Sequence, residues 1–136
     1  MKAFFESRDR ADAATEKLKI FAQPQRLMIL SHLLRGESSV SEIDAATNIG
    51  QPALSQQLAA LRRADVVTTR REGKQIWYDL ANDTARLCIR TMEALLTEEP
   101  DPQQVMKAAA LVEAMPEKSA ENRTTGTGTA GFAKIL

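Results

Sequence analysis

Two short amphipathic segments separated by a tight turn constrain the fold of this 136-residue chain more than any other feature. The first segment, residues 40–47, follows a capping-box sequence at residues 39–42 (SVSE), in which serine and glutamate side chains satisfy free amides of a helix start. Asn48 suits a left-handed helix end, and the second segment, residues 52–64, begins with proline in its first turn. The pattern predicts a helix-turn-helix.

The second segment has one apolar face and one polar face. Its leucines fall at positions i, i+4 and i+7, which would anchor one side of a helix to a core. An α-helix fits the major groove of DNA, where glutamine can bond to adenine edges and serine can contact a base or a phosphate. The outward side is therefore predicted to read DNA. Its candidate residues are Gln51, Ser55, Gln56 and Arg63, and the anchoring leucines are Leu54, Leu58 and Leu61.

After residue 65 the apolar period changes to two. Residues 66–71 are rich in β-branched side chains, Glu72-Gly73 supplies a turn, and residues 75–80 alternate, with Tyr78 on the apolar side. The pattern predicts a β-hairpin, or wing, over residues 66–80. Although Lys plus Arg (18) balances Asp plus Glu (18) over the chain, residues 62–75 carry a net charge of +3. Basic side chains there can neutralise DNA phosphates; the candidates are Arg70, Arg71 and Lys74.

Amphipathic helices are predicted on both sides of this unit. Apolar side chains recur at helical spacing over residues 11–22, and a second helix runs from Pro24 until Gly36 ends it. Residues 83–97 form a further helix, and Asp101 caps a last one that reaches residue 115. The expected fold class is mainly α, a winged helix-turn-helix in the order α-α-α-α-β-β-α with an extra C-terminal helix.

These motifs resemble a known family. The sequence AQPQRLMILSHLL (residues 22–34), followed by residues 39–80 with QPALSQQL and IWYDL, is similar to the ArsR/SmtB family of small dimeric bacterial repressors. The resemblance covers residues 11–98. It implies a homodimer joined through the first and last core helices, which binds a palindromic operator in double-stranded DNA and leaves it when an inducer binds. Gln51, Ser55 and Gln56 match the family's recognition positions, and Arg70, Arg71 and Lys74 match its wing.

On this interpretation the chain has three parts. Residues 1–100 form the DNA-binding and dimerisation domain, and residues 101–115 form the additional helix. Residues 116–136 are expected to be a flexible tail, because their Gly, Thr and charged side chains cannot bury enough surface to offset the cost of ordering them.

The family's sensor residues are missing from this chain. Where one group of metal sensors has Cys-Val-Cys, this chain has Ser39-Val40-Ser41, whose hydroxyls do not replace thiolates. The zinc-sensor positions align with Asn82, Thr84, Leu95 and Glu98, of which only Glu98 could ligate strongly. The branch most similar in its wing senses persulfides through two cysteines, and those positions fall near Ser31 and Thr97. No metal and no cofactor are therefore predicted.

The single cysteine and single histidine limit the chemistry further. Cys88, beside Leu87, is most simply a small buried hydrophobe, and the alternative is a redox switch. His32 is expected on a helix surface rather than in a metal site. One His, one Cys and no paired carboxylates on a common predicted face leave no nucleophile-base pair, so the chain is predicted not to be an enzyme.

The sequence as a whole predicts a DNA-binding transcriptional regulator. No apolar stretch reaches the ~18 residues of a membrane span and no signal peptide is recognisable, so a cytoplasmic location is expected and no membrane partner. The alternative is a winged-helix protein-interaction module without DNA binding, which only the zero net charge favours. The sequence leaves three alternatives for the inducer: a small organic ligand at the dimer interface, oxidation of Cys88, or no inducer at all.

Overall fold

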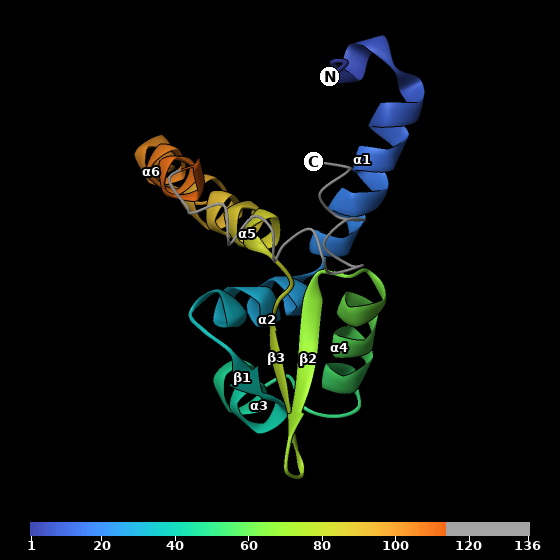
Figure 1. Cartoon of the computed structure of the whole chain (residues 1–136), viewed down its shortest axis with the longest axis vertical. Coiled ribbons are helices and arrows are strands. Elements are labelled where there is room, and N and C mark those ends of the chain that lie inside the picture. Colours follow the sequence, from blue (N-terminus) through green and yellow to red (C-terminus); the bar gives the residue numbers. More distant parts are fainter. Residues whose placement is uncertain (114–136) are drawn as a thin grey trace.

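The computed structural model of the chain describes residues 1–113, and Figure 1 shows how their elements are arranged. The predicted winged helix-turn-helix with an added C-terminal helix is confirmed. The tail predicted at 116–136, and residues 114–115 of the predicted last helix, lie outside the described residues. In chain order the elements are η1 (Phe4–Glu6), α1 (Arg8–Phe21), α2 (Pro24–Leu34), β1 (Ser38–Ser39), α3 (Val40–Thr47), α4 (Ala53–Arg63), β2 (Val67–Glu72), β3 (Gln75–Leu80), α5 (Asp83–Leu95) and α6 (Pro102–Glu113).

The helix-turn-helix begins at the predicted capping box. The Ser39 hydroxyl accepts a hydrogen bond from the Glu42 amide at 3.2 Å, and the Glu42 carboxylate accepts one from the Ser39 amide at 3.3 Å. At the other end of α3, Asn48 adopts the predicted left-handed conformation with φ of 54°. Gly50 follows with φ of 80°, a conformation that L side chains rarely adopt. The backbone conformations of Asn48 and Gly50 set the turn that leads into α4.

The sheet has a third strand that the sequence does not predict. Its order is β1-β3-β2, with β3 antiparallel to both neighbours. The predicted hairpin pairs Val67 with Leu80 at its base and Glu72 with Gln75 at its tip. The added strand, β1, has only two residues, and it pairs with residues almost forty positions later in the chain. The wing is therefore joined at its base to the segment that starts α3.

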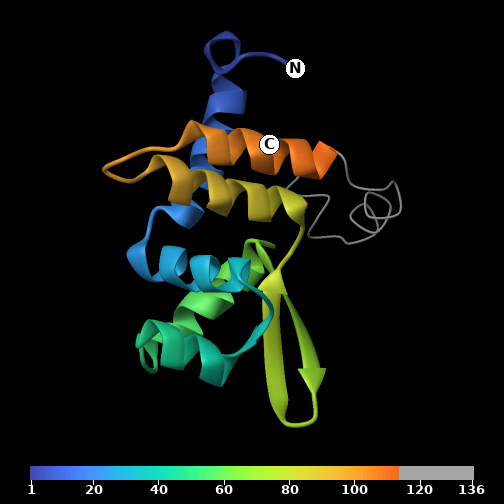
Figure 2. The same ribbon diagram turned by 90° about the vertical axis from the view of Figure 1, so that its left-hand side faces the viewer.

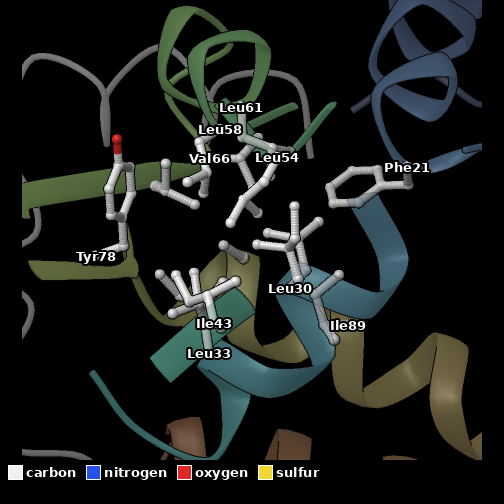
Figure 3. Close-up of a cluster of buried hydrophobic side chains, with 14 residues drawn as sticks. Phe21, Leu30, Leu33, Ile43, Leu54, Leu58, Leu61, Val66, Tyr78 and Ile89 are labelled. Carbon is white, nitrogen blue, oxygen red and sulfur yellow. The ribbon is translucent and has the colours of Figure 1, made fainter. Parts of the chain in front are cut away.

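One apolar core joins α2, α3, α4, the sheet and α5 (Figure 3). Leu30 of α2 is fully buried, and Leu54 of α4 is equally inaccessible. Tyr78 is 9% exposed and belongs to the core, as its place on the apolar side of the hairpin predicts. Because α4 and both strands of the wing contribute to this core, the core fixes the orientation of α4 relative to the wing. Its other buried members include Phe21, Ile29, Leu33, Ile43, Leu58, Leu61, Val66, Leu80 and Ile89.

Helices α5 and α6 lie side by side at the end of the molecule opposite the tip of the hairpin (Figures 1 and 2). Asp101 accepts a hydrogen bond from the Gln103 amide at 3.1 Å, so it caps α6 as predicted. Ala108 of α6 is buried, whereas Met106 and Leu111 are each 66% exposed. The packing of α6 on α5 thus covers only part of the apolar side of α6. None of the helices among residues 1–113 is long and apolar enough to cross a membrane.

Removal of α6 is expected to lower the thermal stability of the protein. Truncation after Pro100 would expose the side of α5 that α6 covers, and burial of apolar surface contributes about 25 cal/mol per Å². Truncation after Met115 keeps α6 and is expected to leave the unfolding temperature and DNA affinity nearly unchanged. Thermal unfolding followed by circular dichroism compares the two. Equal unfolding temperatures for both truncations would contradict the stabilising role of α6.

Candidate nucleic-acid interface

Helix α4 presents its polar side to solvent, as the leucine spacing predicts. Leu54, Leu58 and Leu61 are at most 2% exposed, so they fix the helix to the core. The exposed residues on the outer side include three of the predicted DNA contacts. Because residues seven apart lie on nearly the same side of an α-helix, Gln56 and Arg63 follow one another along this side. The three residues are Ser55, Gln56 and Arg63.

Gln51 and Ser55 are joined to each other at the start of α4. The Gln51 side-chain oxygen accepts hydrogen bonds from the Ser55 amide at 3.1 Å and the Ser55 hydroxyl at 2.5 Å. This arrangement caps the helix with a side chain, in a region where backbone amides would otherwise be free. It also leaves the Gln51 amide nitrogen as a donor and the Ser55 oxygen as an acceptor. On a binding partner, the Gln51 nitrogen can therefore donate to an acceptor atom while the Ser55 oxygen accepts from a neighbouring donor.

The adjacent glutamines of α4 differ in their availability. Gln57 is half-buried, and its side-chain oxygen accepts a hydrogen bond from Arg26 Nε of α2 at 2.8 Å. Gln56 is exposed, and its side-chain amide forms no hydrogen bond with the described residues. Its amide group therefore keeps the donor and the acceptor that a bidentate contact with adenine requires. The sequence predicted Gln56 from helical spacing alone, and the structure adds the structural role of Gln57.

The two arginines of the wing point to opposite sides of the sheet. In antiparallel pairs, partner residues share one face, and neighbouring residues in a strand alternate between faces. Arg70 is paired with Trp77 on the outer face, whereas Arg71 is paired with Ile76 on the face that continues the core. Arg71 and Lys74 are exposed and form no ion pair within residues 1–113. Arg70 instead contacts two carboxylates, those of Glu37 and Glu72.

Sequence reasoning missed two polar residues near this surface. The Asp44 carboxylate accepts a hydrogen bond from the Gly50 amide at 2.9 Å, and this contact holds the turn before α4. Ser41, in the first turn of α3, lines a hollow of about 200 Å³ together with Lys74 of the wing. The capping box at residues 39–42 was a signal for the start of α3, but it did not indicate that Lys74 lies nearby. A residue that carries a hydroxyl group and one that carries an ammonium group therefore line the same hollow.

The positions that match the family's sensor cysteines lie apart from this surface. The Ser31 hydroxyl donates a hydrogen bond to Glu93, whose carboxylate also pairs with Arg35 at 2.8 Å. Ser31 and Glu93 line a cavity of about 290 Å³ between α2 and α5, whose other walls are mainly apolar. Thr97 is exposed just beyond α5. Within residues 1–113, no group of three or more His, Cys, Asp or Glu side chains could hold a metal ion.

Cys88 and His32 both make contacts that support the fold. Cys88 packs against the edge of the core, and burial raises the pKa of its thiol to about 11. Arg86, which could lower that pKa, is engaged in ion pairs with Asp79 and Asp83. The thiol is therefore protonated at neutral pH, which favours its interpretation as a small hydrophobe over a redox switch. The His32 ring lies 2.9 Å from the Ser38 hydroxyl and so joins α2 to β1.

Cys88 is expected to react slowly with iodoacetamide. Only the thiolate reacts, and a pKa about two units above that of an ordinary thiol lowers the thiolate fraction about 100-fold at pH 7.5. The rate of alkylation should rise with pH and reach its midpoint near pH 11. The same protein unfolded in guanidinium serves as the control, and it should react as free cysteine does. A midpoint near pH 9 in the folded protein would contradict the burial argument.

The comparison with known proteins agrees with this geometry. Residues 23–69, from the start of α2 to the middle of β2, match the family described as "Bacterial regulatory protein, arsR family". The chain is 49% identical over 86 residues to the biofilm growth-associated repressor of Agrobacterium fabrum, which covers 63% of this chain and 74% of that protein. It is 40% identical over 78 residues to the transcriptional activator HlyU of Vibrio cholerae, covering 57% and 72% of the two chains.

A solved structure shows the same architecture. The transcriptional repressor BigR from Xylella fastidiosa superposes with a TM-score of 0.60 at 39% sequence identity. The superposition covers 66% of this chain and 89% of the BigR chain. The similarity therefore spans nearly all of the shorter protein. About a third of the present chain lies beyond it.

Proposed function

The chain belongs to the ArsR family of bacterial regulatory proteins and is a DNA-binding transcriptional regulator, and we propose that it represses transcription as a homodimer on a palindromic operator. The observation that carries this proposal is the exposed polar side of α4 beside a basic wing. A regulator needs no catalytic group, and we propose that this chain has no enzymatic activity. The alternative, a winged-helix module that binds only proteins, gives no role to unpaired Arg63, Arg71 and Lys74.

In the proposed complex, α4 enters the major groove with its N-terminal turn closest to the bases. Gln56 contacts an adenine edge through its amide group. The Gln51 amide nitrogen donates to a base acceptor or a phosphate oxygen, and Ser55 fixes its direction. Arg63, two turns further along α4, reaches the sugar-phosphate backbone. The start of α4 thus recognises the base sequence, and the later turns fix the position of the helix along the DNA backbone.

The wing supplies contacts that do not depend on sequence. Arg71 and Lys74 neutralise phosphates on the strand beside the groove, and each neutralised phosphate releases condensed counterions. The hollow between Lys74 and Ser41 offers one phosphate oxygen an ammonium and a hydroxyl group at the same time. These contacts explain how a chain with no net charge can bind DNA, because the positive charge is concentrated at the end of α4 and near the tip of the wing.

A second copy of the chain is proposed to pack through α1 and α5. Leu18 of α1 is 58% exposed and Leu96, just after α5, is 75% exposed, and such apolar side chains favour burial in an interface. A two-fold dimer presents two α4 helices to two half-sites one DNA turn apart, which requires a palindromic operator. Sedimentation equilibrium tests the dimer. A monomer at micromolar concentration would reject it.

The replacement Gln56→Ala tests the proposed base contact. It should lower affinity for the operator by about 1–3 kcal/mol, because the base loses a bidentate partner. Affinity for random DNA should change little, so the ratio of specific to non-specific binding falls. The matched control is Gln104→Ala, which removes an exposed glutamine from α6 at the far end of the molecule. An unchanged ratio in the Gln56 variant would show that Gln56 does not read a base.

A further inference from the structure

Arg70, at the middle of β2, forms a dense set of contacts within the protein. Its Nε atom lies 2.9 and 2.8 Å from the two carboxylate oxygens of Glu37, and its Nη2 atom lies 2.6 Å from the first of them. Its Nη1 atom donates to the Glu72 carboxylate at 2.9 Å. The guanidinium carbon also lies 5.4 Å from the centre of the Trp77 ring. Each of the three guanidinium nitrogens therefore donates to a carboxylate within the protein.

These contacts cross the sheet from one edge to the other. Trp77 of the middle strand β3 is the partner of Arg70 in β2 and also of Ser39 in β1. Glu37 lies two residues before Ser39, so it belongs to the same face of the sheet. Arg70 thus reaches over the Trp77 ring to a carboxylate at the opposite edge. The Arg70 guanidinium lowers the pKa of the Glu37 carboxyl, which keeps that carboxylate charged at neutral pH.

The partners of Arg70 belong to elements that must keep a fixed relation on DNA. Glu37 comes just before Ser39, which caps α3, and α3 is the first helix of the helix-turn-helix. Arg70 lies on the hairpin that carries Arg71 and Lys74. A two-stranded hairpin is flexible by itself. A bidentate arginine-carboxylate pair has a defined geometry, so it can restrain the direction of the hairpin relative to the helices.

We propose that Arg70 is a positioning residue, not a phosphate contact: paired with Glu37 across Trp77, it holds the wing in the direction in which Arg71 and Lys74 reach DNA. The inference rests on the proposed DNA binding and deepens it. A phosphate could bind the Nε–Nη2 side of Arg70 only if the hydrogen bonds to Glu37 were broken. In addition, the Glu37 carboxylate would then be left unpaired beside a polyanion.

The variant Glu37→Gln separates the two roles by the sign of its effect. If Arg70 contacts a phosphate, loss of the competing carboxylate frees the arginine and removes a negative charge, so DNA affinity rises. If Arg70 positions the wing, the same variant loosens the hairpin, and affinity falls. We expect a fall of about 3- to 10-fold, and Arg70→Gln should cause a similar fall, because either change breaks one shared contact.

The double variant Glu37→Gln/Arg70→Gln should bind no more weakly than either single variant. The charge-swapped variant Glu37→Arg/Arg70→Glu should recover part of the lost affinity, although it places a carboxylate at position 70. Arg71→Gln is the matched control: it should reduce the magnitude of the slope of log K against log salt by about 1.8, one phosphate contact per protomer of the dimer, whereas Arg70→Gln should leave the slope nearly unchanged. Tighter binding by Glu37→Gln, or additive losses in the double variant, would overturn the proposal.

Trp77 gives a readout that needs no DNA, because it is the only tryptophan in the chain. Acrylamide should quench its fluorescence more strongly in Glu37→Gln and Arg70→Gln than in the unchanged protein or in Arg71→Gln. That result, together with an absence of DNA binding by the unchanged protein, would reject the proposed function and leave the contact across the sheet standing. Equal quenching in all four proteins would reject the contact itself, whatever the DNA measurements show.

Discussion

Leu54→Ala is expected to lower the free energy of unfolding by about 2–5 kcal/mol, because the side chain is fully buried and its removal leaves a cavity. Leu54 lies in the first turn of α4, where it joins the helix to the core formed by α2 and α5 (Figure 3). Since small domains are stable by only about 5–15 kcal/mol, a loss of this size would leave part of the protein unfolded at moderate temperature. Urea unfolding followed by circular dichroism measures it.

A matched control for Leu54 is Leu111→Ala on α6, which removes the same atoms from a side chain that is 66% exposed. Its effect should stay within about 0.5 kcal/mol, as for most surface substitutions. The comparison separates loss of burial from loss of leucine as a helix former. If the two variants were equally stable, the packing of α4 against the core would not be the main support of this helix.

The second large effect is expected from the double variant Arg71→Ala/Lys74→Ala. Loss of two phosphate contacts per protomer, four per dimer, should reduce the magnitude of the salt slope of DNA binding by about 3.6 and weaken affinity by about 10- to 100-fold at low salt. The affinity of the variant for operator DNA and its affinity for random DNA should fall by similar factors, since phosphates carry no sequence information. Fluorescence anisotropy of labelled duplexes across a salt series measures both quantities.

The control for this variant is Lys2→Ala/Lys107→Ala, which removes the same charge from exposed residues of the N-terminal segment and α6. Both segments lie at the end of the molecule opposite the tip of the wing (Figures 1 and 2). Its salt slope should match that of the unchanged protein, because neither lysine comes close to the duplex. If both double variants lost affinity equally, the effect would come from net charge and not from the wing. An unchanged slope in Arg71→Ala/Lys74→Ala would remove the wing from the interface.

Features encoded by neighbouring residues could be predicted from the sequence. The capping box of Ser39 and Glu42, the left-handed Asn48 and the leucine side of α4 depend on spacings of three or four residues. Burial of Tyr78 follows from the period-two alternation of β3. The exposed positions of Ser55, Gln56 and Arg63 follow from the same spacing, which is why the candidate interface could be described before the fold.

Features that depend on distant residues could not be predicted. Strand β1 has two serines, which have no strand preference of their own, and it exists because β3 offers free backbone groups beside it. The pair of Glu37 and Arg70 joins residues 33 positions apart, and without it Arg70 looks like one more basic residue of the wing. Arg26 and Gln57, which share a hydrogen bond, are 31 positions apart. This contact occupies the side chain of Gln57 and leaves that of Gln56 available. Tertiary packing decides such roles.

The most direct test of sequence-specific DNA binding is selection of duplexes from a random library, followed by titration of the enriched sequence against a shuffled one. The proposed function predicts a palindrome with half-sites one helical turn apart, bound at least about 1,000-fold more tightly than the shuffled duplex. For both duplexes the logarithm of the binding constant should fall linearly with the logarithm of the salt concentration. If no sequence is enriched and binding does not depend on salt, the polar side of α4 and the basic wing do not form a DNA-reading surface.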